Sequence, residues 1–167
     1  MKQKFHRDLK LGNDAEKKLG ELLEKSEFKT QYKNLPEYDL VCEGNGVSFT
    51  VEVKFDKMAS ETGNVAVEFY NTKKCEPSGI TKTTADLWCF VFEKPSEIWL
   101  TATKRLREFL ICKTPFRSIF GAGDNNAALK LYRIEEILPK IFHRVDILSA
   151  DELRLIVRGL LCTSKSP

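Results

Sequence analysis

The most constraining feature of this 167-residue sequence is a pair of β-rich runs on either side of an Asn45-Gly46 turn. The runs are Tyr38–Glu43 and Val47–Lys54, and Asn-Gly favours a tight hairpin turn because these residues accept positive φ. Pairing outward from the turn places Asp39 opposite Glu52 on two antiparallel strands. Facing residues on one side of such a pair have Cβ atoms roughly 4.5–5.5 Å apart. The hairpin therefore predicts two neighbouring carboxylates.

The second run, FTVEVKFD, alternates apolar and polar residues, so Thr50, Glu52 and Lys54 share one face of the strand. Two adjacent carboxylates repel each other unless a positive charge lies between them. A divalent cation, which prefers oxygen ligands, meets that need, and Lys54 adds an ammonium on the same face. Two alternatives stay open at this stage. The face could be an ordinary solvated surface, or a one-residue register shift could separate the acids.

The amino-terminal region predicts a helix over residues 13–25, with a buried stripe that includes Ala15 and Leu19. At about 100° per residue, Glu16 falls at the rim of that stripe, where it could reach a site at the boundary between helix and sheet. The alternative is that Glu16 only completes an N-terminal capping box with Asn13.

Composition limits the class of protein and of site. A length of 167 residues with 42% hydrophobic residues fits one domain, which we expect over residues 1–162, with residues 163–167 as a disordered tail. The net charge of +3 is compatible with a polyanionic partner. His6 and His143 are the only histidines, so a bound metal would be held mostly by oxygen, which points to magnesium or manganese.

Cysteine usage and hydropathy bear on where the chain works. Five cysteines without a C-x-x-C pair are typical of a reduced, intracellular protein, in the cytoplasm or nucleoid, or in the host cytoplasm if the chain is phage-encoded. The longest apolar run, LWCFVF, is much too short to span a bilayer, so we expect no membrane association.

The remaining periodicities complete a predicted fold. Further strands are expected at residues 64–70, 87–93, 97–102 and 128–134, with helices over 104–111 and 151–161. Ser149 and Glu152 form a capping box for the last helix. A helix, a run of strands and then helices predict an α/β protein with a central mixed, largely antiparallel sheet flanked by helices.

These residues together carry a resemblance. A helix with Glu16, then Asp39, then Glu52-Val53-Lys54 after a hairpin resembles the PD-(D/E)xK nuclease superfamily. The order and spacing are most similar to archaeal-type Holliday junction resolvases and related phage-encoded nucleases, over roughly residues 10–92. One departure is that Pro36 stands three residues before Asp39 instead of adjoining it.

The resemblance implies a restriction-endonuclease-like fold and a Mg²⁺-dependent endodeoxyribonuclease, with Mn²⁺ as a substitute metal. Asp39, Glu52 and the backbone carbonyl of Val53 would bind the metal, and Glu16 would bind it directly or through water. Lys54 would position or activate the attacking water. It also implies a homodimer that acts on branched or structured DNA. A restriction- or repair-type endonuclease on linear duplex DNA, and a non-catalytic nucleic-acid-binding protein on the same fold, stay open as alternatives.

Further residues are candidates for contacts to nucleic acid. The loop after residue 76 is rich in hydroxyls and a lysine, which suit phosphate oxygens, and a basic stretch follows residue 103. The candidates are Ser78, Thr81, Lys82, Thr83, Lys104, Arg105 and Arg107, with Glu68 as a possible additional site residue. An ordinary exposed loop and a solvated helix face are the alternatives for these two segments. Trp88 and Trp99 lie in apolar strand patterns and are expected in the core.

Overall fold

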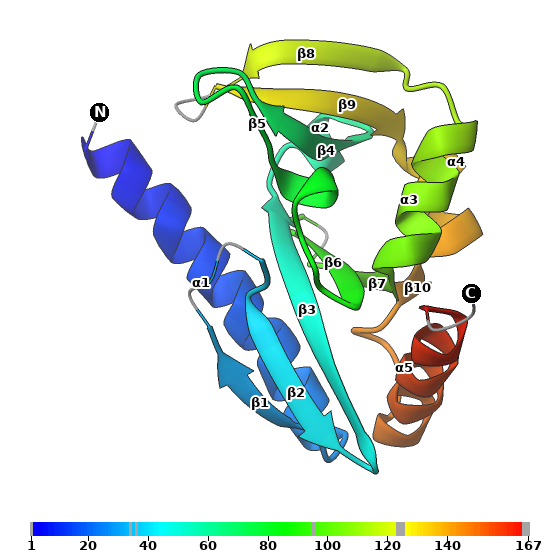
Figure 1. Cartoon of the computed structure of the whole chain (residues 1–167). Helices are drawn as coiled ribbons and strands as arrows, with labels where there is room; N and C mark the ends of the chain where they lie inside the picture. Colours follow the sequence, from blue (N-terminus) through cyan, green and yellow to red (C-terminus); the bar gives the residue numbers. More distant parts are fainter. Residues whose placement is uncertain (1, 34, 36, 95, 123–125, 165–167) are drawn as a thin grey trace.

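The fold is organised around a six-stranded mixed sheet (Figure 1), in a computed structural model that describes residues 2–33, 35, 37–94, 96–122 and 126–164. The strand order is β1-β2-β3-β6-β7-β10, with β3 and β6 parallel and every other neighbouring pair antiparallel. The strands are β1 (Lys29–Tyr32), β2 (Leu40–Gly44), β3 (Val47–Asp56), β6 (Leu87–Phe92), β7 (Ile98–Ala102) and β10 (His143–Arg144).

A second, four-stranded antiparallel sheet has the order β5-β4-β9-β8. Its strands are β4 (Asn64–Asn71), β5 (Glu76–Pro77), β8 (Arg117–Ala122) and β9 (Ala127–Arg133). The helices are α1 (Lys2–Lys25), α2 (Ala59–Thr62), α3 (Thr103–Cys112), α4 (Ile134–Ile141) and α5 (Ala150–Ser164), with a 3₁₀ turn, η1 (Gly79–Thr81). The predicted class, a mixed central sheet flanked by helices, is confirmed. The sequence did not indicate that β4 and β9 leave the central sheet to form a second one.

The predicted hairpin is present with the predicted register. Asn45 and Gly46 both have positive φ, 52° and 76°, and the ladder runs from Gly44–Val47 to Leu40–Val51. It ends there, so Asp39 lies in a bend and not in a paired strand. Aspartate is disfavoured in strands and favoured in turns, which accounts for the start of β2 at Leu40 instead of Tyr38.

The first helix differs from its predicted extent. α1 begins at Lys2, eleven residues before the predicted start, so Asn13 lies in the helix interior and the interpretation of Asn13 as an N-cap was wrong. The segment before Asn13 contains three lysines and two leucines, which are strong helix formers. Because no cap exists at Asn13, Glu16 is left free of the capping role that competed with a site role.

The central sheet carries a core on each face. On one face, Ala15, Leu19 and Leu23 of α1 pack with β3 and α5. On the other face, alternate residues of β6, including Trp88, pack with α3, α4 and the second sheet. All six residues of β6 are therefore buried, and Trp88 is 0% exposed, as expected of a core tryptophan. Trp99 is partly buried against the second core.

The carboxyl-terminal helix begins as predicted. The Ser149 backbone N–H and hydroxyl both donate to the Glu152 carboxylate, at 2.8 and 2.7 Å, which is the expected capping box. The helix continues through Thr163 and Ser164, two residues that we had placed in the tail, and the other tail residues lie outside the described part of the chain. Among the described helices, none is long and apolar enough to cross a membrane.

Candidate active site

Asp39 is fixed against β3 immediately before β2 begins at Leu40. Its backbone N–H donates to the Val51 carbonyl at 3.0 Å, and its Oδ2 accepts the Val53 N–H at 2.7 Å. The Asp39 carboxylate thus accepts the hydrogen bond that a backbone carbonyl of a neighbouring strand would otherwise accept from Val53. The N–H and C=O of one strand residue point to the same side, so the Val53 carbonyl also faces Asp39. The expectation that Asp39 would be a ladder partner of Glu52 was wrong, but the hairpin still brings Asp39 to the same stretch of β3.

Glu52 is the most deeply buried member of the site, at 6% exposure, which excludes the solvated-face alternative for this part of β3. The Lys54 ammonium donates to Glu52 Oε1, and the Thr83 hydroxyl lies 3.3 Å from Oε2. Lys54 also lies 5.7 Å from the centroid of the Trp88 ring. The second core therefore covers the Glu52 face of β3 and holds both charged side chains in a defined place.

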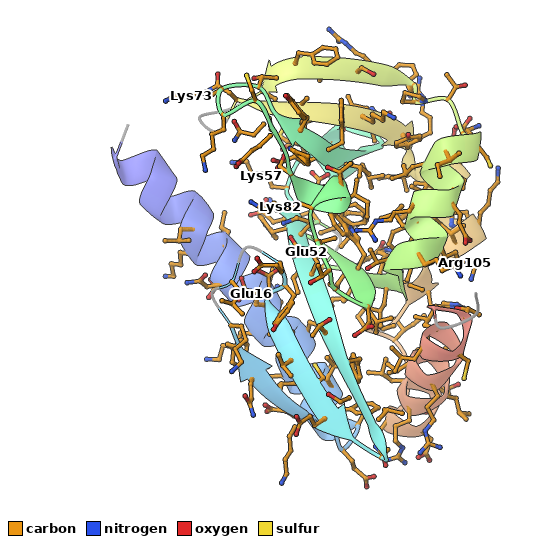
Figure 2. All side chains as sticks on the ribbon, viewed as in Figure 1. Glu16, Glu52, Lys57, Lys73, Lys82 and Arg105 are labelled. Atoms are coloured by element: carbon orange, nitrogen blue, oxygen red, sulfur yellow. The ribbon has the colours of Figure 1, made fainter. Side chains whose placement is uncertain are left out.

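Glu16 reaches this group from α1, and Figure 2 shows it near Glu52. Burial, and then repulsion from Asp39, raise the pKa of the Glu16 carboxyl to about 7, although attraction to Lys54 opposes the shift. Repulsion from Glu52 adds to it. The predicted position of Glu16 at the rim of the buried stripe is thus matched by an interaction with the other three predicted residues.

The site holds more negative than positive groups. Burial also raises the pKa of Asp39 and of Glu52 above their ordinary values, against the effect of Lys54. For Lys54, burial alone would lower the pKa, but the carboxylates of Glu52 and Asp39 raise it. The positive charge of Lys54 is therefore shared by three carboxylates, and the negative charges of these carboxylates repel one another. This surplus is the electrostatic condition under which a divalent cation binds.

The geometry limits how such a cation would be held. Among the residues that the structure describes, no three His, Cys, Asp or Glu side chains are close enough to share one metal ion. Two carboxylates with a carbonyl and several waters still form a suitable set for Mg²⁺, which usually keeps waters and uses one or two carboxylates. Asp39, Glu52 and the Val53 carbonyl fit that set.

Glu68 lies on β4 of the second sheet. It contributes to the raised pKa of Lys54, so its carboxylate is near that ammonium. The Ser78 hydroxyl donates to Glu68 Oε1 at 2.7 Å. The Ser78 hydroxyl is therefore engaged within the protein, and Glu68 is a neighbour of the Lys54 ammonium.

In the loop predicted to contact phosphate, the two threonines donate to backbone carbonyls of the protein, whereas Lys82 is exposed. Thr83 is buried, at 3% exposure, and donates to the Glu37 carbonyl at 2.7 Å, so its hydroxyl is not presented to a ligand in solution, contrary to expectation. Thr81 donates to the carbonyls of Phe69 and Ser78. Lys82 is exposed and lies 3.9 Å from Glu76. Of these loop residues, Lys82 keeps the character of a phosphate contact.

The basic stretch of α3 is not gathered at the acidic residues. Arg107 donates to the carbonyls of Ile80 at 3.0 Å and Thr83 at 2.6 Å, so it fixes the loop that carries Thr83. Arg105 donates to the Lys140 carbonyl at 2.9 Å, and Figure 2 places it far from Glu16 and Glu52. Lys104 is on the same helix, partly exposed, with an interaction of its own.

Sequence reasoning missed two contributions to the site. It did not predict β1, so it missed Tyr32 and Lys33 beside Glu16. It also took Thr83 for a ligand contact when Thr83 is a neighbour of Glu52. The short, mostly polar segment around Tyr32 carries no strand periodicity, and the contact between Thr83 and Glu52 depends on how a loop folds back, which has no local signature.

Comparisons with known proteins leave the family open. No family model and no curated protein matches this sequence. Among solved structures, the bacterial homing endonuclease I-Ssp6803I is similar over 93% of this chain and 96% of that chain, with 15% sequence identity and a TM-score of 0.49. A likeness at this level assigns neither a family nor an activity to the chain.

Proposed function

We propose that this chain is a Mg²⁺-dependent endonuclease of the PD-(D/E)xK type that hydrolyses phosphodiester bonds in DNA. The observation that carries the proposal is the group of three carboxylates, buried Glu52 and partly buried Glu16 and Asp39, around the ammonium of Lys54. A merely structural ion pair would not need three carboxylates whose pKa values are all raised. Such perturbed groups cluster at functional sites.

The residues divide the chemistry between them. Asp39, Glu52 and the Val53 carbonyl would hold the cation, which lowers the pKa of bound water and offsets charge on the phosphate. Lys54 is held by Glu52 and can donate a hydrogen bond to the attacking water or to a phosphate oxygen, stabilising negative charge as it develops. Glu16 would orient a water from the α1 side.

A basic rim near this group supports DNA as the substrate. Figure 2 shows Lys57, Lys73 and Lys82 between the β4–β5 turn and Glu52. Lys82 directly precedes Thr83, which contacts Glu52, and Lys57 follows three residues after Lys54. Lysines in this arrangement would contact successive phosphates on one side of a scissile bond, positioning the strand without reading its sequence.

The direct test is cleavage by purified protein. Labelled four-way junctions, flaps, single strands, linear duplexes and RNA should be incubated with Mg²⁺ or Mn²⁺. We expect cleavage of DNA by the wild-type protein and a loss of at least about 100-fold for Asp39→Asn and Lys54→Met. The Asp39→Asn side chain keeps an oxygen that can accept the Val53 N–H, so the fold is retained. Asp151→Asn, on the exposed start of α5, is the matched control and should cleave normally.

The same panel decides the finer points. Paired nicks in junctions, with a dimer in solution, would support the resolvase-like interpretation with branched DNA and a homodimer. Cleavage of linear duplexes at a defined sequence, with junctions left intact, would favour the restriction- or repair-type alternative. DNA binding that needs no Mg²⁺, with no cleavage of any substrate in either metal, would contradict the proposed enzyme and favour a non-catalytic binding protein.

A further inference from the structure

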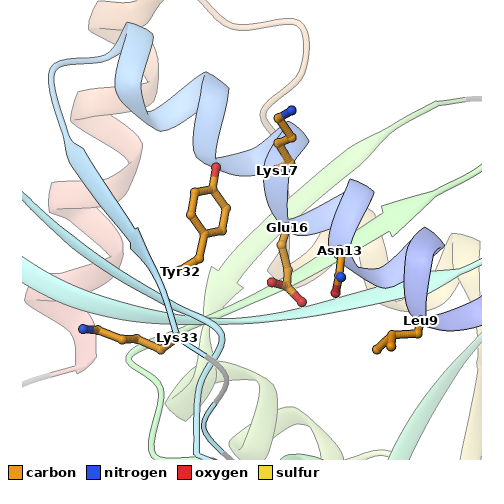
Figure 3. Close-up of a pocket in the computed structure, with 6 residues that line it drawn as sticks. All are labelled: Leu9, Asn13, Glu16, Lys17, Tyr32 and Lys33. Atoms are coloured by element: carbon orange, nitrogen blue, oxygen red, sulfur yellow. The ribbon is translucent and has the colours of Figure 1, made fainter. Parts of the chain in front are cut away.

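A pocket of about 460 Å³ opens beside Glu16, between α1 and β1 (Figure 3). This volume falls in the range of small-ligand sites, about 300–1,000 Å³. It is lined by Leu9, Asn13, Glu16, Lys17, Tyr32 and Lys33. The lining combines an aromatic ring, an aliphatic side chain, an amide, a carboxylate and two ammonium groups.

One face of α1 forms a wall of the pocket. Leu9, Asn13, Glu16 and Gly20 follow at intervals of four, three and four residues, so they lie on the same side of the helix. Figure 3 shows the Asn13 amide and the Glu16 carboxylate pointing the same way from that face. The hydrogen-bonding groups of the helix are therefore aligned along the pocket.

The opposite wall is the ring of Tyr32. A Cβ on Gly20 would lie 2.3 Å from the Tyr32 hydroxyl oxygen, so the ring reaches α1 only because residue 20 is glycine. Tyr32 nevertheless stays 49% exposed, and Leu9 is 53% exposed. An aromatic ring held at both ends, with half of its surface open, is a preformed stacking surface.

The pocket is continuous with the candidate active site. Glu16 lines the pocket and also belongs to the acidic group of the candidate active site. The Lys33 N–H donates to the Asp39 carbonyl at 2.7 Å, which ties the end of β1 to the bend that carries Asp39. A ligand in the pocket would therefore lie directly beside the group that reacts at Asp39 and Glu52.

We propose that this pocket takes one unstacked nucleotide of the DNA strand next to the scissile phosphate. The base would stack on Tyr32 against Leu9 and pair its polar edge with the Asn13 amide, while Lys17 and Lys33 contact the adjoining phosphates. Base–aromatic stacking and lysine contacts are the usual means of holding single-stranded nucleic acid. The inference rests on the proposed function, because the pocket shares Glu16 with the candidate active site.

A paired and stacked base cannot enter such a pocket without leaving the helix, so the pocket predicts a substrate preference. DNA with an unpaired nucleotide beside the cut, as in branched, flapped or bulged substrates, avoids most of the unstacking penalty. A perfect linear duplex does not.

The test measures binding without catalysis. Fluorescence anisotropy in EDTA would compare two duplexes that carry one extrahelical position, occupied either by thymidine or by an abasic spacer. We expect wild-type protein and Tyr32→Phe to bind the thymidine duplex about tenfold more tightly, a factor within the range measured for stacking on one aromatic residue. Tyr32→Leu should bind both duplexes equally. Leu155→Ala, an exposed apolar residue of α5, is the control and should keep the preference.

Each outcome decides one proposal or both. Equal binding of the two duplexes by wild-type protein overturns the pocket, even if Mg²⁺-dependent cleavage is observed; so does a tenfold preference kept by Tyr32→Leu with an unchanged melting temperature. A preference without cleavage in Mg²⁺ or Mn²⁺ supports the pocket and contradicts the nuclease. No binding to either duplex overturns the pocket, and it overturns the nuclease as well if no DNA substrate is cleaved in Mg²⁺ or Mn²⁺.

Discussion

The chemical properties of Glu16 are set by the residues that surround it in the folded chain. In an isolated α1 it would be one of several glutamates on a helix, but β3 and the Asp39 bend surround it with carboxylates. Its pKa is raised to about 7 mainly by burial. Because this folded value exceeds the ordinary value of 4.5, the ionised form weakens the folded state.

The first prediction concerns Glu16→Gln without metal. Below pH 4.5 Glu16 is protonated whether folded or unfolded, so the change should matter little. As pH rises from 4.5 to about 7 the native protein loses stability, and above that pH the loss is constant. Glu16→Gln should therefore raise the free energy of unfolding at about pH 8 by about 1–2 kcal/mol, after allowance for solvent screening. Urea unfolding at about pH 8 and about pH 4 measures this, with Glu21→Gln as an exposed control on α1. An equal effect at both pH values would contradict it.

At the scale of elements, the loop after β5 supports β3 from outside the sheet. Arg107 of α3 fixes the Ile80 and Thr83 carbonyls, and the Thr83 hydroxyl bridges the Glu37 carbonyl and the Glu52 carboxylate. Thr83 is therefore a positioning residue for Glu52, linking it to the bend that carries Asp39.

The second prediction separates this role from DNA contact. Thr83→Val removes the hydroxyl that donates to the Glu37 carbonyl and lies 3.3 Å from the Glu52 carboxylate. Leaving buried polar groups without a partner costs about 1–3 kcal/mol, so kcat should fall about 10- to 100-fold as Glu52 loses its fixed position. DNA affinity without metal should not change, and the Mg²⁺ concentration for half-maximal activity should rise. Thr83→Ser keeps the hydroxyl and should restore activity. A loss of DNA affinity with unchanged kcat would instead support the original prediction of a phosphate contact.

A third prediction uses two glycines in different elements. Gly79 has a φ of 52°, and an added Cβ would lie 2.3 Å from the Glu68 carbonyl oxygen. Gly79→Ala should therefore destabilise the protein by more than about 1 kcal/mol, because both strain and overlap oppose it. Gly12 lies in α1 with open space around it, so Gly12→Ala should stabilise by about 0.5–1 kcal/mol. Thermal melts of both variants and of the wild-type protein provide the measurement. A Gly79→Ala variant as stable as the wild-type protein would contradict the prediction and show that η1 can move away from β4.

For the whole molecule, a bound divalent cation would join α1, the Asp39 bend and β3, which are distant in sequence. We therefore expect Mg²⁺ at about ten times its dissociation constant to add about 1.4 kcal/mol of stability and to raise Tm by about 3–6 °C at about pH 8. Differential scanning fluorimetry in EDTA and in Mg²⁺ measures this shift. Asp39→Asn should abolish most of it, and Asp151→Asn should keep it. No shift in the wild-type protein up to about 20 mM Mg²⁺ would contradict a metal site of useful affinity.

Features that depend on residues close together in the sequence could be predicted, and features that depend on distant residues could not. The Asn45-Gly46 turn, the register from Gly44 to Leu40 and the Ser149 capping box depend on residues a few positions apart, and all were predicted correctly. The predicted start of α1 was wrong because Asn13 resembles an N-cap locally, whereas the residues before it also favour a helix.

What the sequence alone determined was the hairpin, the strand that carries Glu52 and Lys54, the buried stripe of α1 and the mixed α/β class, because these depend on turn chemistry and on periods of about two and about 3.6 residues. What only the tertiary structure decided was the second sheet, the buried role of Thr83, the placement of Arg105 away from the acidic group, and the pocket between α1 and β1. These depend on which distant surfaces meet, and a contact between residues separated by dozens of positions leaves no periodic trace along the chain.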